Sequence, residues 1–103
     1  MYIHVVMLGF RQEPDAGLLA GMEACCARIR QECQGWTMYH FGPNRAVRAQ
    51  GYSHAVISAF TDAQALENYK IHPAHLALEA FIGPYVERLL VLDDELSPAA
   101  LAR

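Results

Sequence analysis

Apolar side chains occupy both alternating faces of the first segment of the chain, residues 2–10. Residues Tyr2, His4, Val6, Leu8 and Phe10 lie on one side, and Ile3, Val5 and Met7 on the other. A strand with this pattern is normally covered on both faces. From Pro14, which suits a first helical position, apolar residues recur at spacings of three and four. This periodicity predicts an amphipathic helix that ends near Gly35.

The middle of the chain alternates with a period of two. Residues 36–41 alternate bulky and polar side chains and stop at Gly42-Pro43-Asn44, which predicts a second strand and a loop. Residues 52–61 predict a third strand. Asp62 then suits the N-cap of a helix over residues 63–70. The third strand places on one face the residues Tyr52, His54, Val56, Ser58 and Phe60.

A break at His72-Pro73 separates two helices, because proline disfavours the helical state of the residue before it. The next helix runs from Pro73 to Gly83-Pro84. Residues 89–92, Leu-Leu-Val-Leu, form an apolar run typical of a buried last strand. The order strand, helix, strand, strand, helix, strand predicts an α+β, ferredoxin-like fold with a four-stranded antiparallel sheet.

The composition adds a prediction about assembly. The chain has 103 residues, of which 53% are hydrophobic and 18% charged. We expect one domain over residues 1–95 and a C-terminal tail over residues 96–103. Helices cover one face of such a sheet, and the strand residues of the other face are apolar too. A second copy of the sheet is the expected cover, which predicts a homodimer with a dimeric α/β barrel between the subunits.

Charge and terminal pattern argue against several classes of partner. A net charge of −3 gives no reason to expect nucleic acid or an anionic membrane. The N-terminal segment has no positive region and reaches Gly9 and Arg11 too early for a signal peptide or a membrane span. We therefore expect a cytoplasmic protein.

Three cysteines fall in the first predicted helix. Cys26 and Cys33 are two turns apart, about 10 Å along the axis, and no Cys-Xaa-Xaa-Cys spacing occurs. We interpret Cys25, Cys26 and Cys33 as reduced packing residues and expect no metal. We also expect no cofactor, because the sequence lacks a phosphate-binding glycine loop, a dinucleotide fingerprint and a nucleophile elbow.

Candidate chemistry gathers in Gly51-Tyr52-Ser53-His54 and in residues 69–75, Tyr-Lys-Ile-His-Pro-Ala-His. Imidazole and phenol groups suit proton transfer and polar recognition near neutral pH. His4 and His54 belong to strands expected to be neighbours, each with a valine, Val6 or Val56, two positions on. If both imidazoles face the helices, they form the floor of one cleft.

A second interpretation of the same residues stays open. In it, His72 only caps the third helix, and His75 bonds a tyrosine or a backbone carbonyl.

Five segments of the sequence together resemble the stress-responsive dimeric α/β-barrel (Dabb) domain family, over about residues 2–94. They are residues 4–8, Gly42-Pro43-Asn44, residues 51–54, residues 69–75 and residues 89–93. The His-Pro-Ala-His element that follows Tyr69 is the specific part. The family includes stress-induced plant proteins, uncharacterised bacterial proteins, and a plant polyketide cyclase that closes an aromatic ring by an aldol-type condensation.

The resemblance implies roles for individual residues. In the cyclase branch, the positions of Tyr69 and His75 are the catalytic pair, and those of His4 and His54 line the pocket. Cys26 stands where the cyclase has a tyrosine. This difference changes the polarity and shape of the pocket, so the polyketide substrates do not carry over.

We therefore predict a protein that binds a small hydrophobic, carbonyl-containing ligand in a cleft between sheet and helices. The predicted catalytic residues are Tyr69 and His75, and the predicted ligand-binding residues are His4, Val6, His54, Val56 and Cys26. Two enzymatic alternatives remain. The first is a cofactor-free lyase or cyclase using the Tyr–His pair for acid/base chemistry, and the second is a heme-free monooxygenase.

Overall fold

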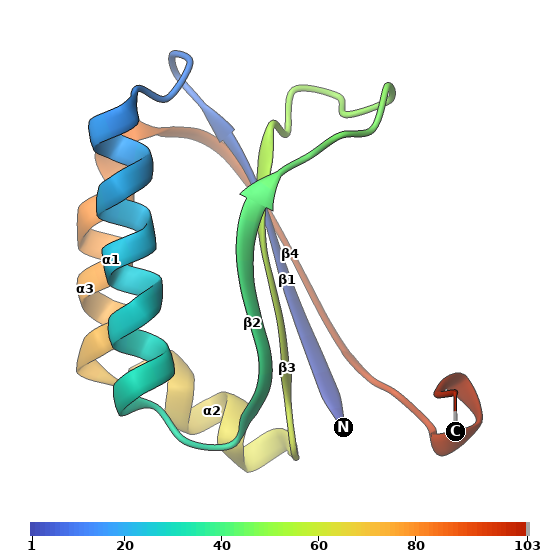
Figure 1. The fold of residues 1–103 in the computed structure, drawn as a ribbon. Helices are drawn as coiled ribbons and strands as arrows, with labels where there is room; N and C mark the ends of the chain where they lie inside the picture. The colour runs from blue at the N-terminus through green and yellow to red at the C-terminus, as the bar shows by residue number, and fades with distance from the viewer. Residues whose placement is uncertain (103) are drawn as a thin grey trace.

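The structure, a computed structural model, describes residues 1–102. One antiparallel sheet with the strand order β2-β3-β1-β4 is covered on one face by helices (Figure 1). This is the predicted ferredoxin-like fold. Its elements are β1 (Tyr2–Phe10), α1 (Ala16–Glu32), β2 (Trp36–Pro43), β3 (His54–Phe60), α2 (Ala63–Ile71), α3 (Pro73–Ile82), the short helix η1 (Gly83–Tyr85), β4 (Val86–Glu95) and the short helix η2 (Pro98–Ala100).

The hydrophobic core lies between the sheet and the helices. Met22, Cys26 and Ile29 of α1 are fully buried, as is Phe60 of β3. Their spacing of three and four residues places all three on the side of α1 that faces the sheet. The periodicity of the sequence therefore predicted the correct buried face of this helix.

Capping side chains fix where the helices begin. Asp15 accepts a hydrogen bond from the backbone N–H of Leu18 at 2.8 Å, so α1 begins at Ala16 rather than at Pro14 as predicted. Asp62 caps α2 as predicted, accepting from the backbone N–H of Ala65. His72 ends α2 and caps α3, because its Nδ1 accepts from the N–H of Ala74 at 3.0 Å.

The last strand differs from the prediction. The strand β4 spans Val86–Glu95, which is longer than residues 89–92, and it lies at the edge of the sheet beside β1. The predicted burial of Leu89–Leu92 is wrong for the single subunit, since each of these side chains is about half exposed. The reason is that β4 is an edge strand, in which Leu90 and Leu92 lie on the sheet face without helices, while Leu89 and Val91 line a cavity instead of packing in the core.

The sheet face away from the helices is uncovered (Figure 1). The register of the strands places on this face the apolar side chains of Ile3, Val5, Met7, Met38, Ile57, Leu90 and Leu92. Of these, Met38, Ile57, Leu90 and Leu92 are exposed. An apolar surface of this kind marks an interaction site rather than a solvated face.

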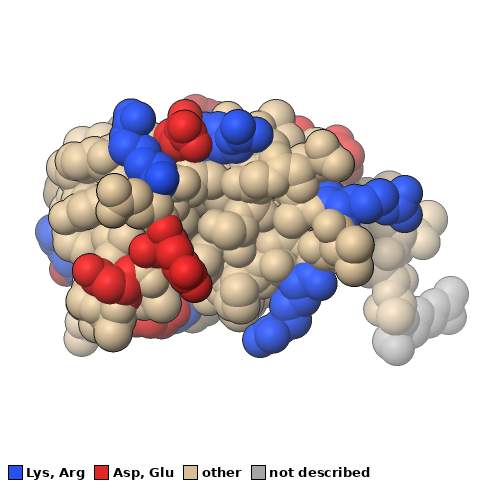
Figure 2. All heavy atoms as spheres, turned by 90° about the horizontal axis from the view of Figure 1, so that it is seen from above, with Lys and Arg blue, Asp and Glu red and all other residues tan. Residues whose placement is uncertain are grey.

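Charged groups on the end of the molecule seen from above are of both signs. Figure 2 shows basic and acidic side chains interspersed among uncharged ones at this end. Such mixing agrees with the small net charge of −3 and favours no polyanionic partner. In residues 1–102, no helix is both long and apolar enough to cross a bilayer.

Candidate functional site

A cavity of about 330 Å³ lies between the sheet and the helices α2 and α3. This volume is at the lower end of the range for small-molecule sites. Its wall combines polar and apolar side chains from six elements, the four strands and the helices α2 and α3. These side chains are those of His4, Val6, Leu8, Tyr39, Val56, Tyr69, Lys70, His75, Leu78, Glu79, Ile82, Leu89, Val91 and Asp93.

The register of the sheet sorts the cavity floor by polarity. His4 is paired with Asp93 of β4, in the same row of the sheet as Tyr39 of β2. In the next row on the same face, Val6 is paired with Val91 and with Val56; beyond it Leu8 is paired with Leu89. The floor therefore changes from polar to apolar over about 13 Å, at 3.3 Å per residue.

Two buried tyrosines form a hydrogen-bonded pair at the polar end. The phenol oxygens of Tyr39 and Tyr69 lie 2.8 Å apart, and the two residues are only 5% and 3% exposed. Burial raises the pKa of both phenols, so both are neutral near pH 7. Two neutral hydroxyls that share one hydrogen bond use only one of their two hydrogens. The other hydrogen is free to donate to a ligand.

His75 is held by its Nδ1 atom. This nitrogen lies 3.0 Å from the carbonyl oxygen of Lys70, which can only accept, so Nδ1 carries the hydrogen. The Glu79 carboxylate lies 3.3 Å from the same nitrogen. In the neutral ring, Nε2 is then the proton acceptor. The rings of His75 and Tyr69 are 4.4 Å apart between centroids, which places a base beside the phenol pair.

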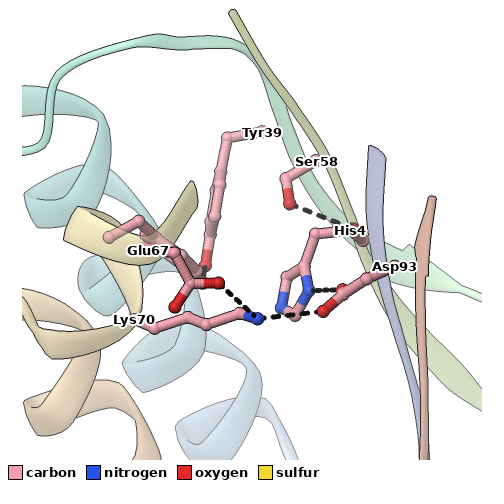
Figure 3. Close-up of polar contacts among 7 residues, drawn as sticks. His4, Tyr39, Ser58, Glu67, Lys70 and Asp93 are labelled. Carbon is pink, nitrogen blue, oxygen red and sulfur yellow. Dashed lines mark hydrogen bonds and ion pairs between the residues drawn. The ribbon is translucent and has the colours of Figure 1, made fainter. Parts of the chain in front are cut away.

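His4 is held in a similar way from the sheet. Its Nδ1 atom is hydrogen-bonded to the Asp93 carboxylate, which also receives a hydrogen bond of 2.9 Å from Lys70 Nζ (Figure 3). Burial alone would raise the pKa of Asp93, but the hydrogen bonds from His4 and Lys70 outweigh it and lower that pKa. Asp93 is therefore ionised at neutral pH. The rings of His4 and Tyr69 pack edge to face, with 5.9 Å between their centroids.

The structure brings together five of the seven predicted site residues. His4, Val6, Val56, Tyr69 and His75 all line the one cavity. His54 and Cys26 lie outside it. Whether the five act on a ligand remains a prediction.

The prediction that His54 lines the same cleft as His4 is wrong, because His54 lies outside the cavity. His54 faces the helices, but the register pairs it with Leu8, four residues along β1 from His4. Its ring stacks on Phe41 at 5.6 Å and meets the edge of Phe10 at 5.3 Å. Burial lowers the pKa of His54, which favours a neutral ring packed among aromatic side chains. Matching faces on neighbouring strands were not enough, because the antiparallel register separates the two histidines.

Cys26 is also misplaced by the prediction. Its side chain is 0% exposed in the core beneath α1 and does not reach the cavity wall. Burial raises the pKa of its thiol to about 11. Cys25, Cys26 and Cys33 are all free thiols. In residues 1–102, no three histidine, cysteine, aspartate or glutamate side chains are grouped so that they could hold a metal ion.

The packing interpretation of the histidines also describes what is seen. His72 caps α3, and His75 bonds a backbone carbonyl. The carbonyl bond of His75, however, uses only one ring nitrogen while the residue lines the cavity. Its structural contact and a role toward a ligand are therefore compatible.

Four polar residues of the cavity were missed by the sequence analysis, namely Tyr39, Lys70, Glu79 and Asp93. Asp93 carried a usable signal. In an antiparallel pair, the start of one strand lies beside the end of the other. If the first and last strands pair, the residue that follows Leu89–Leu92 is therefore expected near His4. Tyr39 had a weaker signal, because its place depends on a register shift between Trp36 and Met38.

Comparison with known families agrees with this architecture. The chain matches the family described as "Stress responsive A/B Barrel Domain" over residues 3–96. It belongs to this family. No curated protein matches the chain.

Solved structures with the same fold come from plants and bacteria. A protein from Arabidopsis thaliana is 21% identical with a TM-score of 0.82, and the alignment covers 98% of this chain and 100% of that one. The hydroxynitrile lyase of Passiflora edulis is 18% identical with a TM-score of 0.81, covering 94% of both chains. A dimeric ferredoxin-like protein of unknown function from Jannaschia sp. CCS1 is 27% identical with a TM-score of 0.81, covering 92% of this chain and 98% of that one.

Proposed function

We propose that this chain binds a small, neutral, carbonyl-containing compound with an apolar part. The observation that carries the proposal is the free phenol hydrogen of the Tyr39–Tyr69 pair in a cavity of about 330 Å³. A carbonyl oxygen is the natural acceptor for that hydrogen. The valine and leucine rows of the floor then receive the apolar part.

The charges at the cavity favour a neutral ligand. Two carboxylates, those of Glu79 and Asp93, line the wall. The ammonium of Lys70 is already bonded to Asp93 and lies 3.4 Å from the Glu67 carboxylate. An anionic ligand would therefore face two like charges and one cation that is already paired.

Turnover is the second candidate, as a cofactor-free lyase or cyclase. Its support is the contact of Tyr69 with His75, whose Nδ1 is fixed and whose Nε2 can accept a proton. His75 would take a proton from a hydroxyl or an acidic carbon of the ligand. Tyr69 would stabilise the negative oxygen by donating its hydrogen. The likeness to a hydroxynitrile lyase, at 18% identity, fits this class of chemistry without naming a substrate.

We further propose that two copies pair through the uncovered sheet face and enclose a barrel between them. The apolar residues of that face support this, together with the solved neighbour from Jannaschia sp. CCS1, which is described as dimeric. The cavity lies on the opposite, helix-covered side of the sheet. Pairing therefore leaves the ligand site of each subunit intact. The three free cysteines fit the reducing environment of the cytoplasm, where we place the protein.

The test of ligand binding begins with small molecules that co-purify with the protein, identified by mass spectrometry. A neutral carbonyl compound released by denaturation of the wild type, and lost from Tyr69→Phe and His75→Asn, supports the proposal. Tyr85→Phe and His72→Asn are matched controls, because Tyr85 lies outside the cavity and asparagine can replace His72 as a helix cap. Equal retention in the site variants and their controls contradicts the proposal.

A further inference from the structure

The second histidine of the cavity, His4, has a partner that the proposed chemistry does not use. Its Nδ1 is bonded to Asp93, and Lys70 holds the other carboxylate oxygen at 2.9 Å. Ser58, beside it in the sheet, donates to the backbone carbonyl of His4 at 3.0 Å and leaves the ring free. The imidazole is 6% exposed, so this arrangement lies within the protein rather than on its surface.

An ionised carboxylate can only accept hydrogen bonds, so the hydrogen of a neutral His4 ring resides on Nδ1. Nε2 is then a bare acceptor. Figure 3 shows this second nitrogen on the side of the ring that faces the helices, away from Asp93. The cavity lies on that side.

We propose that Asp93 is a positioning residue that holds His4 with Nε2 as a hydrogen-bond acceptor toward the cavity, and that the site therefore selects compounds carrying a hydroxyl group as well as a carbonyl. The inference rests on the proposed function and names its ligand class more closely. The phenol pair supplies one donor to the ligand, and the imidazoles of His4 and His75 supply two acceptors. A simple ketone or aldehyde can accept the hydrogen bond from the phenol pair, but it has no hydrogen to donate to either imidazole.

Lys70 contributes to the positions of both imidazoles, those of His4 and His75. Its side chain holds Asp93, the partner of His4, and its backbone carbonyl holds His75. Both imidazoles are thus fixed through Nδ1 and both present Nε2. If the ligand hydroxyl transfers its proton to His4, the O–H bond breaks, an N–H bond forms at Nε2, and the electron pair stays on the ligand oxygen. Asp93 then faces the imidazolium with an opposite charge.

The first measurement is the tautomer of His4 in the ligand-free protein, from ¹⁵N NMR of the imidazole nitrogens at about pH 9, where an ordinary histidine is neutral. We expect the hydrogen on Nδ1 in the wild type and a mixture of tautomers in Asp93→Ala. Asp94→Ala, a change at the next residue of β4, which is paired with Ile3 and lies outside the cavity, is expected to retain the wild-type pattern. A wild-type ring with its hydrogen on Nε2, or an unchanged pattern in Asp93→Ala, overturns the assignment.

A folding defect in Asp93→Ala does not leave the question open. Asp93→Asn keeps the shape of the side chain, but its amide can donate as well as accept, so it no longer imposes a hydrogen on Nδ1. The same mixture of tautomers is expected in this variant. A pure Nδ1–H form there would overturn the role of the carboxylate.

The second measurement compares two probes, 3-hydroxybenzaldehyde and 3-methoxybenzaldehyde, because only the first can donate to Nε2. One hydrogen bond of about 1 kcal/mol predicts about fivefold tighter binding of the hydroxy compound by the wild type. This preference is lost in Asp93→Ala and kept in Asp94→Ala. Equal binding of both probes refutes the ligand class while leaving carbonyl binding in place. Binding of neither refutes both the ligand class and the proposed function.

Discussion

The hydroxyl groups of Tyr39 and Tyr69 share one hydrogen bond of 2.8 Å at the polar end of the cavity, between the second strand and the second helix. Because both phenols are buried and neutral, the pair has one hydrogen more than it uses. Tyr39 as donor leaves the hydrogen of Tyr69 for the ligand. The pair also joins the sheet to the helix that carries Tyr69, so it serves both the fold and the site.

Replacement of Tyr39 by phenylalanine tests this double role. We expect Tyr39→Phe to lower the free energy of unfolding by about 1–2 kcal/mol, because the buried hydroxyl of Tyr69 loses its protein partner. Urea denaturation measures this change. Tyr85→Phe is the control, because Tyr85 is 48% exposed and outside the cavity. Equal stability of the two variants would show that the pair contributes nothing to the fold.

The buried thiol of the first helix is expected to be stabilising and unreactive. Burial raises the pKa of Cys26 to about 11, so its side chain is almost entirely in the thiol form at neutral pH. Iodoacetamide should modify the partly exposed Cys25 well before Cys26, as peptide mass spectrometry can show. Cys26→Ala should cost about 1–2 kcal/mol of stability and Cys25→Ala less. Faster alkylation of Cys26 than of Cys25 would contradict its placement in the core.

The lowered pKa of Asp93 predicts a pH dependence of stability. A carboxyl group whose pKa is lower in the folded than in the unfolded state stabilises the fold fully above the unfolded value of 3.8. This contribution declines as the pH falls below that value and is lost below the folded pKa. Urea unfolding from neutral pH down to about pH 3 should therefore show wild type and Asp93→Asn converging only in the acid range. A stability difference that does not depend on pH would contradict the ionised state of Asp93.

We expect the uncovered sheet face to form a dimer interface, and a charged side chain introduced on that face to prevent dimerisation. Ile57 lies on this face, 38% exposed, and a carboxylate there cannot be buried against a second sheet without a large desolvation cost. Light scattering should give twice the 11.5 kDa chain mass for the wild type and the monomer mass for Ile57→Glu. Leu76→Glu makes the same change on α3, where Leu76 is 50% exposed, and should remain dimeric. A monomeric wild type at micromolar concentration is incompatible with the proposed pairing.

Much of the fold could be predicted from local patterns. The alternation of apolar residues in β1 and β3, the cap at Asp62 and the break at His72-Pro73 each depend on residues close in sequence. The exposure of β4 could not be predicted in this way, because an apolar run has the same sequence pattern in a central strand and in an edge strand. Strand order decides between them.

The site divides in the same way. Tyr69 and His75 are six residues apart around one helix break, so their meeting follows from local structure. His4 and Asp93 are 89 residues apart and meet only through the register of β1 and β4. The register of β1 and β3 keeps His54 away from His4, although both face the helices. Two strand pairings were thus needed, one to correct a predicted site residue and one to add another.

The most direct test of carbonyl binding observes the carbonyl group itself. The ¹³C resonance of 3-hydroxybenzaldehyde, labelled at the carbonyl carbon and bound in the cavity, reports the hydrogen bond that its oxygen accepts. We predict that the resonance of the probe bound to the wild type lies downfield of that bound to Tyr69→Phe, with Tyr85→Phe matching the wild type. An identical shift in the wild type and in Tyr69→Phe, with the probe bound to both, would contradict the assignment of Tyr69 as the carbonyl donor.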